Sequence, residues 1–236
     1  KYCQHPNIVK IHKALDVGVE VWLILELVKG GNLNRVATSN SSPFLEPEIA
    51  FVGREILRGL KYLHENMIAH RDLKNLNIMI SIAGEVKIID FGLAVDVSLG
   101  ERVQMVGSPF WMAPEMIRGE PHSLPVDVWG FVVSMLELAN RVPPNGNVKR
   151  AMFLVATNGL PKKFANGQVW SEEFQDFVDK CATPDPTLRP TAQELLQHRF
   201  LSKKCSRGAL KRKLEPLFFH DALQGTGMQM SKNIYK

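Results

Sequence analysis

The stretch from His70 to Gly92 constrains the fold of this chain more than any other. It reads His-Arg-Asp-Leu-Lys-Asn-Leu-Asn, then two short apolar segments, then Asp-Phe-Gly. Residues 78–80 and 86–89 predict two strands, and the pair at 83–84 predicts the turn between them. The chain therefore folds back on itself here, and the polar residues that flank the two strands meet at one end of a hairpin.

Two of these polar residues, Asn77 and Asp90, have the chemistry of a cation site. An amide oxygen and a carboxylate held side by side make half of a site for a hard cation such as Mg²⁺, which phosphate oxygens can complete. Asp72 lies on the loop just before them, close enough to take a proton from a hydroxyl group presented to that metal. Lys74 lies between them and can neutralise phosphate charge. The alternative is an unrelated loop aspartate and a hairpin with a polar end.

This arrangement resembles the catalytic core of protein kinases. A lone Asp-Phe-Gly would be weak evidence, but both motifs occur at this spacing and Ala113-Pro-Glu115 follows them. The resemblance implies that Asp72 is the catalytic base and that Lys74 steadies the transferring phosphate. It also implies that Asn77 and Asp90 ligate Mg²⁺.

Two further strands are predicted at residues 8–15 and 21–25, with a turn at 16–18. They lead into Glu26-Leu-Val-Lys-Gly-Gly31. Taken alone, that segment is a strand end with a flexible Gly-Gly exit. The kinase resemblance implies instead a hinge whose backbone holds the adenine ring of ATP. The residues that would line the adenine site are Leu25 as gatekeeper, Glu26, Leu27, Val28 and Met79.

Apolar side chains at helical spacing predict several helices. Residues 47–64, with Pro47 in the first turn, predict an amphipathic helix that leads to the catalytic loop. Residues 127–139 are almost continuously apolar and predict a buried central helix. Residues 172–180 and 191–199 predict two more amphipathic helices. We assign all these apolar stripes to core packing.

Three charged residues outside the central stretch are candidates for structural roles. Asp127 could accept backbone N–H bonds from the catalytic loop. Glu115 and Arg189 are the natural candidates for a buried ion pair, and breaking one half of such a pair costs about 3–5 kcal/mol. The alternative for all three is a solvated surface charge.

The connection at 90–115 is long for a compact domain, and such loops are usually functional. The resemblance implies that Ser108 and the residues after it form a shelf for the substrate backbone, with Ser108 bonded to Asp72 and Lys74. The position of the family's phosphorylated Thr holds Gln104, which cannot acquire the charge of about −1.5 to −2 that would pair with Arg71. We therefore expect no activation by phosphorylation at that position.

The resemblance is closest to Ser/Thr protein kinases of the p21-activated branch of the sterile-20 group. Lys74 after His-Arg-Asp-Leu points to the Ser/Thr class rather than the Tyr class. Similarity extends from His5 to about Leu201. The segments that carry it are Met105-Val-Gly-Ser-Pro-Phe-Trp-Met-Ala-Pro-Glu115, Arg150-Ala-Met-Phe-Leu-Val-Ala-Thr-Asn-Gly159 and Glu194-Leu-Leu-Gln-His-Arg-Phe200.

The fold that the resemblance implies is an α+β kinase-like fold. Residues 1–28 would be the remnant of a small β lobe, residues 29–201 a mostly helical large lobe, and residues 202–236 a basic tail. The implied reaction is transfer of the ATP γ-phosphate to Ser or Thr hydroxyls of proteins, with Mg²⁺. Regulation of a parent protein by a small GTPase is implied only by analogy, because no GTPase-binding segment lies in this chain.

The chain departs from the family at its start, which is Lys1 rather than Met, so we expect a fragment. The Gly-rich phosphate loop, the strand lysine and its glutamate partner are missing from it, and we expect chain 1–236 to be an inefficient kinase. Two alternatives stay open: a non-catalytic kinase-like scaffold, and a partial gene model of an active kinase. Leu76 and Val142 replace acidic residues that help the family to select arginine upstream of the target, so we expect a weaker preference for basic substrates.

Composition bounds the remaining possibilities. Residues 201–236 hold eight Lys and Arg against two acidic residues, a charge of +6, so the rest of the chain contributes −1 to the net charge of +5. We infer no nucleic-acid partner, because the body of the chain is close to neutral. No apolar run approaches the roughly 20 residues that span a bilayer, and there is no signal peptide at the start. Three scattered cysteines favour a reducing compartment, which we take as cytoplasmic.

The tail places Lys211-Arg-Lys213 beside four large apolar residues. A basic amphipathic segment of this kind could lie on an acidic membrane or dock on a partner. The favoured interpretation is a loose solvated tail that Pro216 interrupts. The apolar residues are Leu210, Leu214, Leu217 and Phe218.

Overall fold

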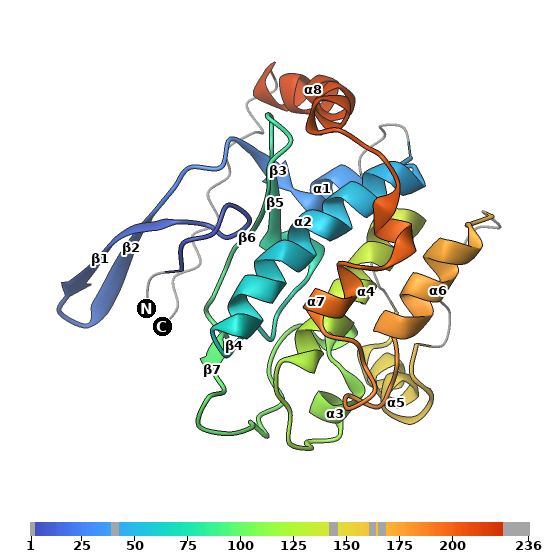
Figure 1. Ribbon diagram of the computed structural model, residues 1–236. Helices are drawn as coiled ribbons and strands as arrows, with labels where there is room; N and C mark the ends of the chain where they lie inside the picture. Colours follow the sequence, from blue (N-terminus) through green and yellow to red (C-terminus); the bar gives the residue numbers. More distant parts are fainter. Residues whose placement is uncertain (1–2, 39–42, 142–145, 161–163, 165–168, 224–236) are drawn as a thin grey trace.

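The computed structural model describes residues 3–38, 43–141, 146–160, 164 and 169–223 (Figure 1). A helical body surrounds α2 and α4, a three-stranded sheet lies against one side of it, and one hairpin projects away from it. The helices are α1 Leu33–Thr38, α2 Glu46–Glu65, α3 Pro114–Ile117, α4 Pro125–Asn140, α5 Val148–Asn158, α6 Glu172–Cys181, α7 Ala192–Leu195 and α8 Arg207–Leu223. The strands are β1 Ile11–Val17, β2 Glu20–Leu25, β3 Gly30–Asn32, β4 Ile68–Ala69, β5 Ile78–Ser81, β6 Val86–Ile88 and β7 Val95–Asp96.

The projecting hairpin consists of β1 and β2, which pair antiparallel with Val17 opposite Glu20. The prediction of two strands is confirmed, but the turn lies at 18–19 because Gly18 adopts a positive φ of 70°. Residues 8–9 do not belong to β1. They bond instead to β6, where the Val9 N–H donates to the Ile88 carbonyl at 2.9 Å. The apolar side chains of β2 are 45–68% exposed from Val21 to Leu25.

The predicted hairpin in the central stretch is confirmed. β5 and β6 pair antiparallel with Ile78 opposite Ile88, and Gly84 turns the chain with a φ of 76°. Sequence reasoning missed β3, which pairs with β5 on its other side to give the order β3-β5-β6. Gly30 has to be glycine in this pairing, because a Cβ there would overlap the carbonyl oxygen of Ile80.

The two long helices of the body match the prediction to within two residues at each end. One face of α2 is buried along its whole length, and Val126 to Ala139 of α4 are all buried. Trp129 and Phe131 of α4 have no exposed surface. Such burial stabilises each large apolar side chain by about 1.5–3 kcal/mol, and it makes α4 the rigid support for everything packed on it.

The helix predicted at 191–199 is wrong in extent. α7 ends at Leu195, and the chain continues as a 3₁₀ turn from Arg199 to Ser202. The His198 side chain explains the break: Nδ1 accepts a hydrogen bond from the Phe200 N–H at 3.3 Å, and Nε2 lies 2.9 Å from the Asp176 carboxylate. These two contacts fix the His198 ring, so α7 ends before His198 and the 3₁₀ turn begins after it.

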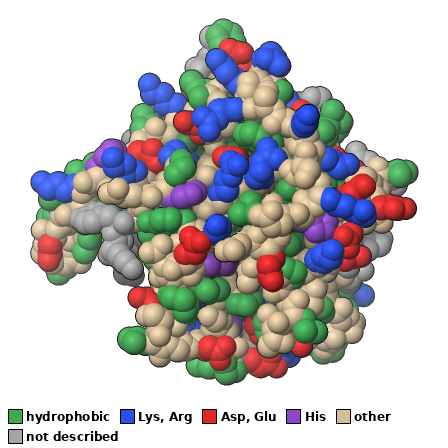
Figure 2. All heavy atoms as spheres, viewed as in Figure 1, with side chains coloured by type: hydrophobic (Ala, Val, Ile, Leu, Met, Phe, Trp, Pro, Cys, Tyr) green, Lys and Arg blue, Asp and Glu red, His purple; other side chains and the backbone are tan. Residues whose placement is uncertain are grey.

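The expectation of a loose solvated tail is wrong as far as Leu223. Residues 207–223 form α8, which runs through Pro216 and buries Leu210, Leu214 and Phe218 in the same core as α2 and α4. Their four-residue spacing puts these three side chains on one face. The outward side carries Lys and Arg, which show blue at the top of Figure 2. Within the described residues, no helix is both long enough and apolar enough to cross a bilayer.

Candidate active site

Asp72 is held by three neighbours that leave its carboxylate in one orientation. Oδ2 accepts hydrogen bonds from Lys74 Nζ at 2.8 Å and Asn77 Nδ2 at 3.0 Å, and Oδ1 accepts the Ser108 N–H at 2.9 Å. Lys74 Nζ also donates to Ser108 Oγ at 2.6 Å. The structure therefore bonds Ser108 to both Asp72 and Lys74, as the sequence predicted. A carboxylate, an ammonium group and a hydroxyl meet at one point between the catalytic loop and the long connection.

Asn77 and Asp90 come from the two arms of the β5–β6 hairpin. The Ile89 N–H donates to the Asn77 carbonyl at 2.9 Å, so Asp90 follows directly after the residue paired with Asn77. Asn77 Nδ2 also bonds the Asp72 carbonyl at 2.9 Å, which turns the amide oxygen away from Asp72. Asp90 adopts a left-handed φ of 61°, and its Oδ1 accepts the Gly92 N–H at 3.2 Å.

Asn77 and Asp90 have the side-chain oxygens expected of a magnesium site that also uses phosphate oxygens of a bound molecule. An amide oxygen and a carboxylate suit a hard cation, and Mg²⁺ usually takes few protein ligands and completes its shell with phosphates and water. Among the described residues no cluster of three or more His, Cys, Asp and Glu side chains could hold a metal by itself. The hairpin end thus places one amide and one carboxylate close together.

Asp127 supports the catalytic loop from below. Its carboxylate accepts the backbone N–H groups of His70 and Arg71, both at 2.8 Å, and lies 3.0 Å from His64 Nε2. Burial opposes ionisation of Asp127, but the hydrogen bonds and charges of His64 and His70 outweigh it and lower the pKa of the carboxyl. The predicted role of Asp127 is confirmed. Arg71 is held at a positive φ of 64° immediately before Asp72.

Glu115 and Arg189 form the predicted buried ion pair. Both guanidinium NH groups reach the carboxylate, at 2.8 and 3.0 Å, and the two side chains are 1% and 0% exposed. Arg189 also donates to the carbonyls of Thr183, Pro184 and Pro125 and lies 5.2 Å over the Trp129 ring. The pair joins the end of the long connection to α4 and to the segment before α7.

Of the residues predicted to hold adenine, two lie open to solvent and three are partly buried. Leu25 and Leu27 are 45% and 65% exposed. The Glu26 side chain turns to Lys10 and Lys87, accepting the Lys10 N–H at 2.7 Å and Lys87 Nζ at 2.8 Å. Val28 is partly buried, and Met79 lies on β5 opposite Asn32 of β3. The hinge segment thus leads directly into the sheet that carries Met79.

Comparison with known proteins decides the family. A family model described as the protein kinase domain matches residues 1–201. The chain belongs to the protein kinase family. Its fold is therefore the α+β kinase fold with a small part of the β lobe.

The relatives found among curated proteins are Ser/Thr kinases. The chain is 46% identical over 227 residues to the probable serine/threonine-protein kinase mkcB of Dictyostelium discoideum, over 95% of this chain and 31% of that protein. It is 39% identical over 203 residues to serine/threonine-protein kinase shk1/pak1 of Schizosaccharomyces pombe, over 84% of this chain and 30% of that protein. For pakB of D. discoideum the identity is 39% over 215 residues, with 89% and 25% covered.

The chain thus spans about a third or less of the length of these relatives. The matches also differ in how much of the chain they include. A match that covers 95% of the chain extends past residue 201 into α8, whereas the kinase family model ends at residue 201. The match to mkcB therefore includes the residues of α8, which the kinase family model does not.

Gln104 lies beside Arg71 in this kinase domain. Its Oε1 is 3.5 Å from Arg71 NH1, at the long limit of a hydrogen bond, while Arg71 Nε donates to the Leu93 carbonyl at 2.8 Å. Partial burial and the nearby Arg102 guanidinium lower the pKa of Arg71. The neutral Gln104 amide therefore lies next to Arg71, which is itself close to Arg102. Val142, the other departure noted near the end of α4, lies outside the described residues.

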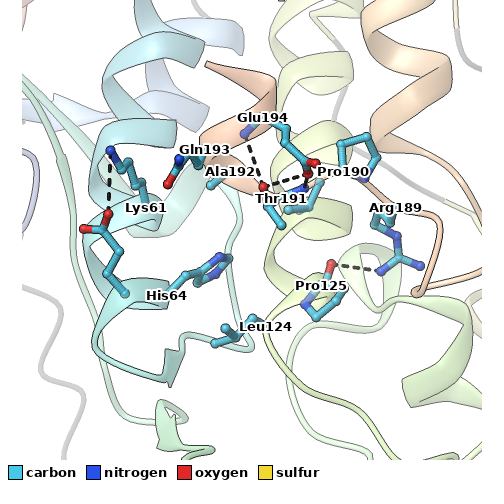
Figure 3. A pocket seen from close by; sticks show the side chains of 12 residues that line it. Lys61, His64, Leu124, Pro125, Arg189, Pro190, Thr191, Ala192, Gln193 and Glu194 are labelled. Atoms are coloured by element: carbon cyan, nitrogen blue, oxygen red, sulfur yellow. Dashed lines mark hydrogen bonds and ion pairs between the residues drawn. The ribbon is translucent and has the colours of Figure 1, made fainter. Parts of the chain in front are cut away.

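Two features away from Asp72, Asn77 and Asp90 carried no signal in the sequence. One is a surface pocket of about 420 Å³ lined by the end of α2, the start of α4 and residues 189–194 (Figure 3). Asp72, Asn77 and Asp90 do not line it. The other is Glu137 on α4, which is 2% exposed: Oε1 accepts a hydrogen bond from Asn34 Nδ2 at 2.8 Å, and no described residue bonds Oε2. Burial raises the pKa of Glu137 to about 7, against the effect of the Asn34 hydrogen bond.

Proposed function

We propose that this domain transfers the γ-phosphate of ATP to Ser or Thr hydroxyls of protein substrates. The observation that carries the proposal is the set of hydrogen bonds on Asp72 from Lys74, Asn77 and Ser108. It supports a base held ready for a substrate hydroxyl, beside a cation that can meet the transferring phosphate. Phosphoryl transfer depends mostly on such positioning and charge stabilisation.

Each residue then has a distinct task. Asp72 orients the substrate hydroxyl and takes its proton, and Lys74 steadies the phosphate. Asn77 and Asp90 hold Mg²⁺ together with ATP phosphate oxygens. When bound, Mg²⁺ supplies charge neutralisation at the phosphates.

The adenine ring would lie between the hinge and β5. Leu25, Glu26, Leu27, Val28 and Met79 are the residues that would contact it, with hydrogen bonds from the hinge backbone. The exposure of Leu25 and Leu27 supports this role, because their side chains are available to a ligand. We also propose a cytoplasmic location, since Cys181 and Cys205 are free thiols.

Nucleotide binding tests the metal and adenine parts of the proposal. We expect chain 1–236 to bind a non-hydrolysable ATP analogue only when Mg²⁺ is present, as measured by titration calorimetry. Asp90→Asn should remove the Mg²⁺ dependence, and Asp16→Asn on the exposed β1–β2 hairpin is the matched control. Binding that ignores Mg²⁺, or that survives Asp90→Asn unchanged, would contradict the assignment.

Turnover tests the role of Asp72. Asp72→Asn should leave analogue binding intact and lower transfer of labelled phosphate to a Ser/Thr peptide library by about 10²–10⁴-fold, the usual contribution of a general base. Equal turnover of Asp72→Asn and the original chain would refute the role. Mg²⁺-dependent binding without any transfer would favour a non-catalytic scaffold that holds nucleotide.

A further inference from the structure

α8 lies outside the residues that the kinase family model matches, yet it is packed into the kinase domain. Leu210, Leu214 and Phe218 are 0%, 1% and 8% exposed and belong to the core that contains α2 and α4. The neighbouring Phe219 is 66% exposed. One face of α8 is therefore packed against the body, while another face is exposed to solvent.

Polar contacts fix the position of α8 along α2. Lys213 Nζ lies 2.7 Å from Glu48 Oε2, donates to the Pro43 carbonyl at 2.6 Å, and lies 4.9 Å over the Phe44 ring. At the start of the helix, Ser206 Oγ accepts the Ala209 N–H at 3.1 Å. The bond from Lys213 to the first turn of α2 fixes how α8 is turned about its own axis, so that its apolar face packs against the body.

In this position α8 touches the sheet β3-β5-β6 at two points. A Cβ added to Gly31 of β3 would lie 3.2 Å from Phe218 Cε1, so the aromatic ring rests directly on the strand. A Cβ added to Gly84 would lie 2.9 Å from the carbonyl oxygen of Arg207, so the start of α8 rests on the β5–β6 turn. Figure 1 shows α8 lying across this end of the sheet.

The strand under Phe218 is the one that follows the hinge. β3 has three residues, two of them glycine, and glycine loses more conformational freedom on ordering than any other residue. Its own side chains therefore contribute little to holding it against β5. Yet its position matters, because Asn32 pairs with Met79 and the Lys29 carbonyl accepts the Ile82 N–H at 2.7 Å.

We propose that Phe218 is a positioning residue for the nucleotide site: α8 presses β3 onto β5 and so fixes the hinge against Met79. The inference rests on the proposed function, since it deepens the account of how adenine is bound. It makes the helix beyond residue 201 a working part of the catalytic unit. Phe218 itself touches no substrate; it acts through Gly31.

Hydrogen exchange of chain 1–236 without nucleotide tests the contact directly. Phe218→Ala should speed exchange of the β3 amides and of the Ile82 amide by at least about tenfold, because removal of a buried ring permits local opening. Phe219→Ala, on the same helix but solvent-exposed, should leave these amides unchanged. Phe218→Leu should retain most of the protection.

Nucleotide binding is the second measurement. Phe218→Ala should weaken Mg²⁺-dependent binding of the ATP analogue by several-fold, and by reciprocity the analogue should slow exchange of α8 amides in the unmodified chain. The proposal is overturned if Phe218→Ala speeds exchange in α8 alone, or if Phe219→Ala has equal effects.

If Phe218→Ala does not fold, Gly31→Ala tests the contact between β3 and α8 instead, because it keeps Phe218 and adds a methyl group under its ring. Faster exchange of α8 amides in Gly31→Ala supports the contact, and unchanged exchange refutes it. If the unmodified chain binds no nucleotide, the proposed function fails, while the exchange of β3 still decides whether α8 holds that strand.

Discussion

Replacing Arg189 by Met is the sharpest test of what holds the long connection at 90–115 to the body. The substitution removes the guanidinium and keeps a side chain of similar length. It leaves the Glu115 carboxylate, which is 1% exposed, without its two hydrogen bonds at 2.8 and 3.0 Å. It also leaves the carbonyls of Pro125, Thr183 and Pro184 without the bonds that Arg189 donates.

The expected magnitude follows from that burial. Removing one partner of a buried ion pair costs about 3–5 kcal/mol, because the remaining charge is neither solvated nor paired. For a chain of 236 residues, each kcal/mol lowers the Tm by about 2–4 °C. We therefore expect Arg189→Met to lower the Tm by about 6–20 °C.

Thermal unfolding followed by circular dichroism measures this shift, and the chain offers a matched control. Arg118 forms a two-bond pair with Glu120 at 2.7 Å for both contacts, but those side chains are 35% and 48% exposed. Arg118→Met should cost much less, because water solvates the carboxylate that remains. The double variant Glu115→Gln/Arg189→Met should be more stable than Arg189→Met alone, since it leaves no unpaired charge. Equal losses for Arg189→Met and Arg118→Met would show that burial is not what makes the Glu115 pair matter.

The other predictions concern pH, regulation and specificity. Because burial raises the pKa of Glu137 in the folded state to about 7, we expect its contribution to stability to be complete below the usual pKa of 4.5 and to fall as pH rises to about 7. Glu137→Gln, which keeps the Asn34 hydrogen bond, should remove that part of the pH dependence in urea titrations from pH 5 to 8; an unchanged slope would contradict it. Gln104→Glu places a carboxylate beside Arg71 and should raise kinase activity, whereas Gln104→Asn should not; equal rates would show that the loop needs no charge there. Leu76 is 47% exposed, and Leu76→Glu should strengthen the preference for basic peptides. An unchanged peptide-array profile would show that this position does not contribute to substrate selection.

The local part of the active site could be predicted because it depends on short-range geometry. Asn77 and Asp90 flank two strands joined by a tight turn, so one hairpin brings them to the same end whatever the rest of the fold does. The Asp72 loop precedes that hairpin directly. The partners of Asp127 and Arg189 were also predictable, since a charge inside an apolar helix or a buried segment needs a specific partner.

The tertiary structure alone decided what depends on surfaces far apart in the sequence. α8 contains Pro216 and a basic run, and its helix depends on an apolar face of the body that can receive Leu210 and Phe218. α7 stops where His198 finds Asp176 on another helix. Two of the three residues of β3 are glycine, and only the structure shows its pairing with β5 and its contact with Phe218 of α8.

The distinction has one physical cause. Turns, strand alternation and catalytic spacing are properties of neighbouring residues, and sequence alone determined them here, including the hairpin that carries the proposed metal ligands. Burial is a property of the assembled fold, because the same side chain is exposed or covered according to which distant segment packs on it. Tertiary structure alone therefore decided the raised pKa of Glu137, the pairing of β3 with β5 and the docking of α8.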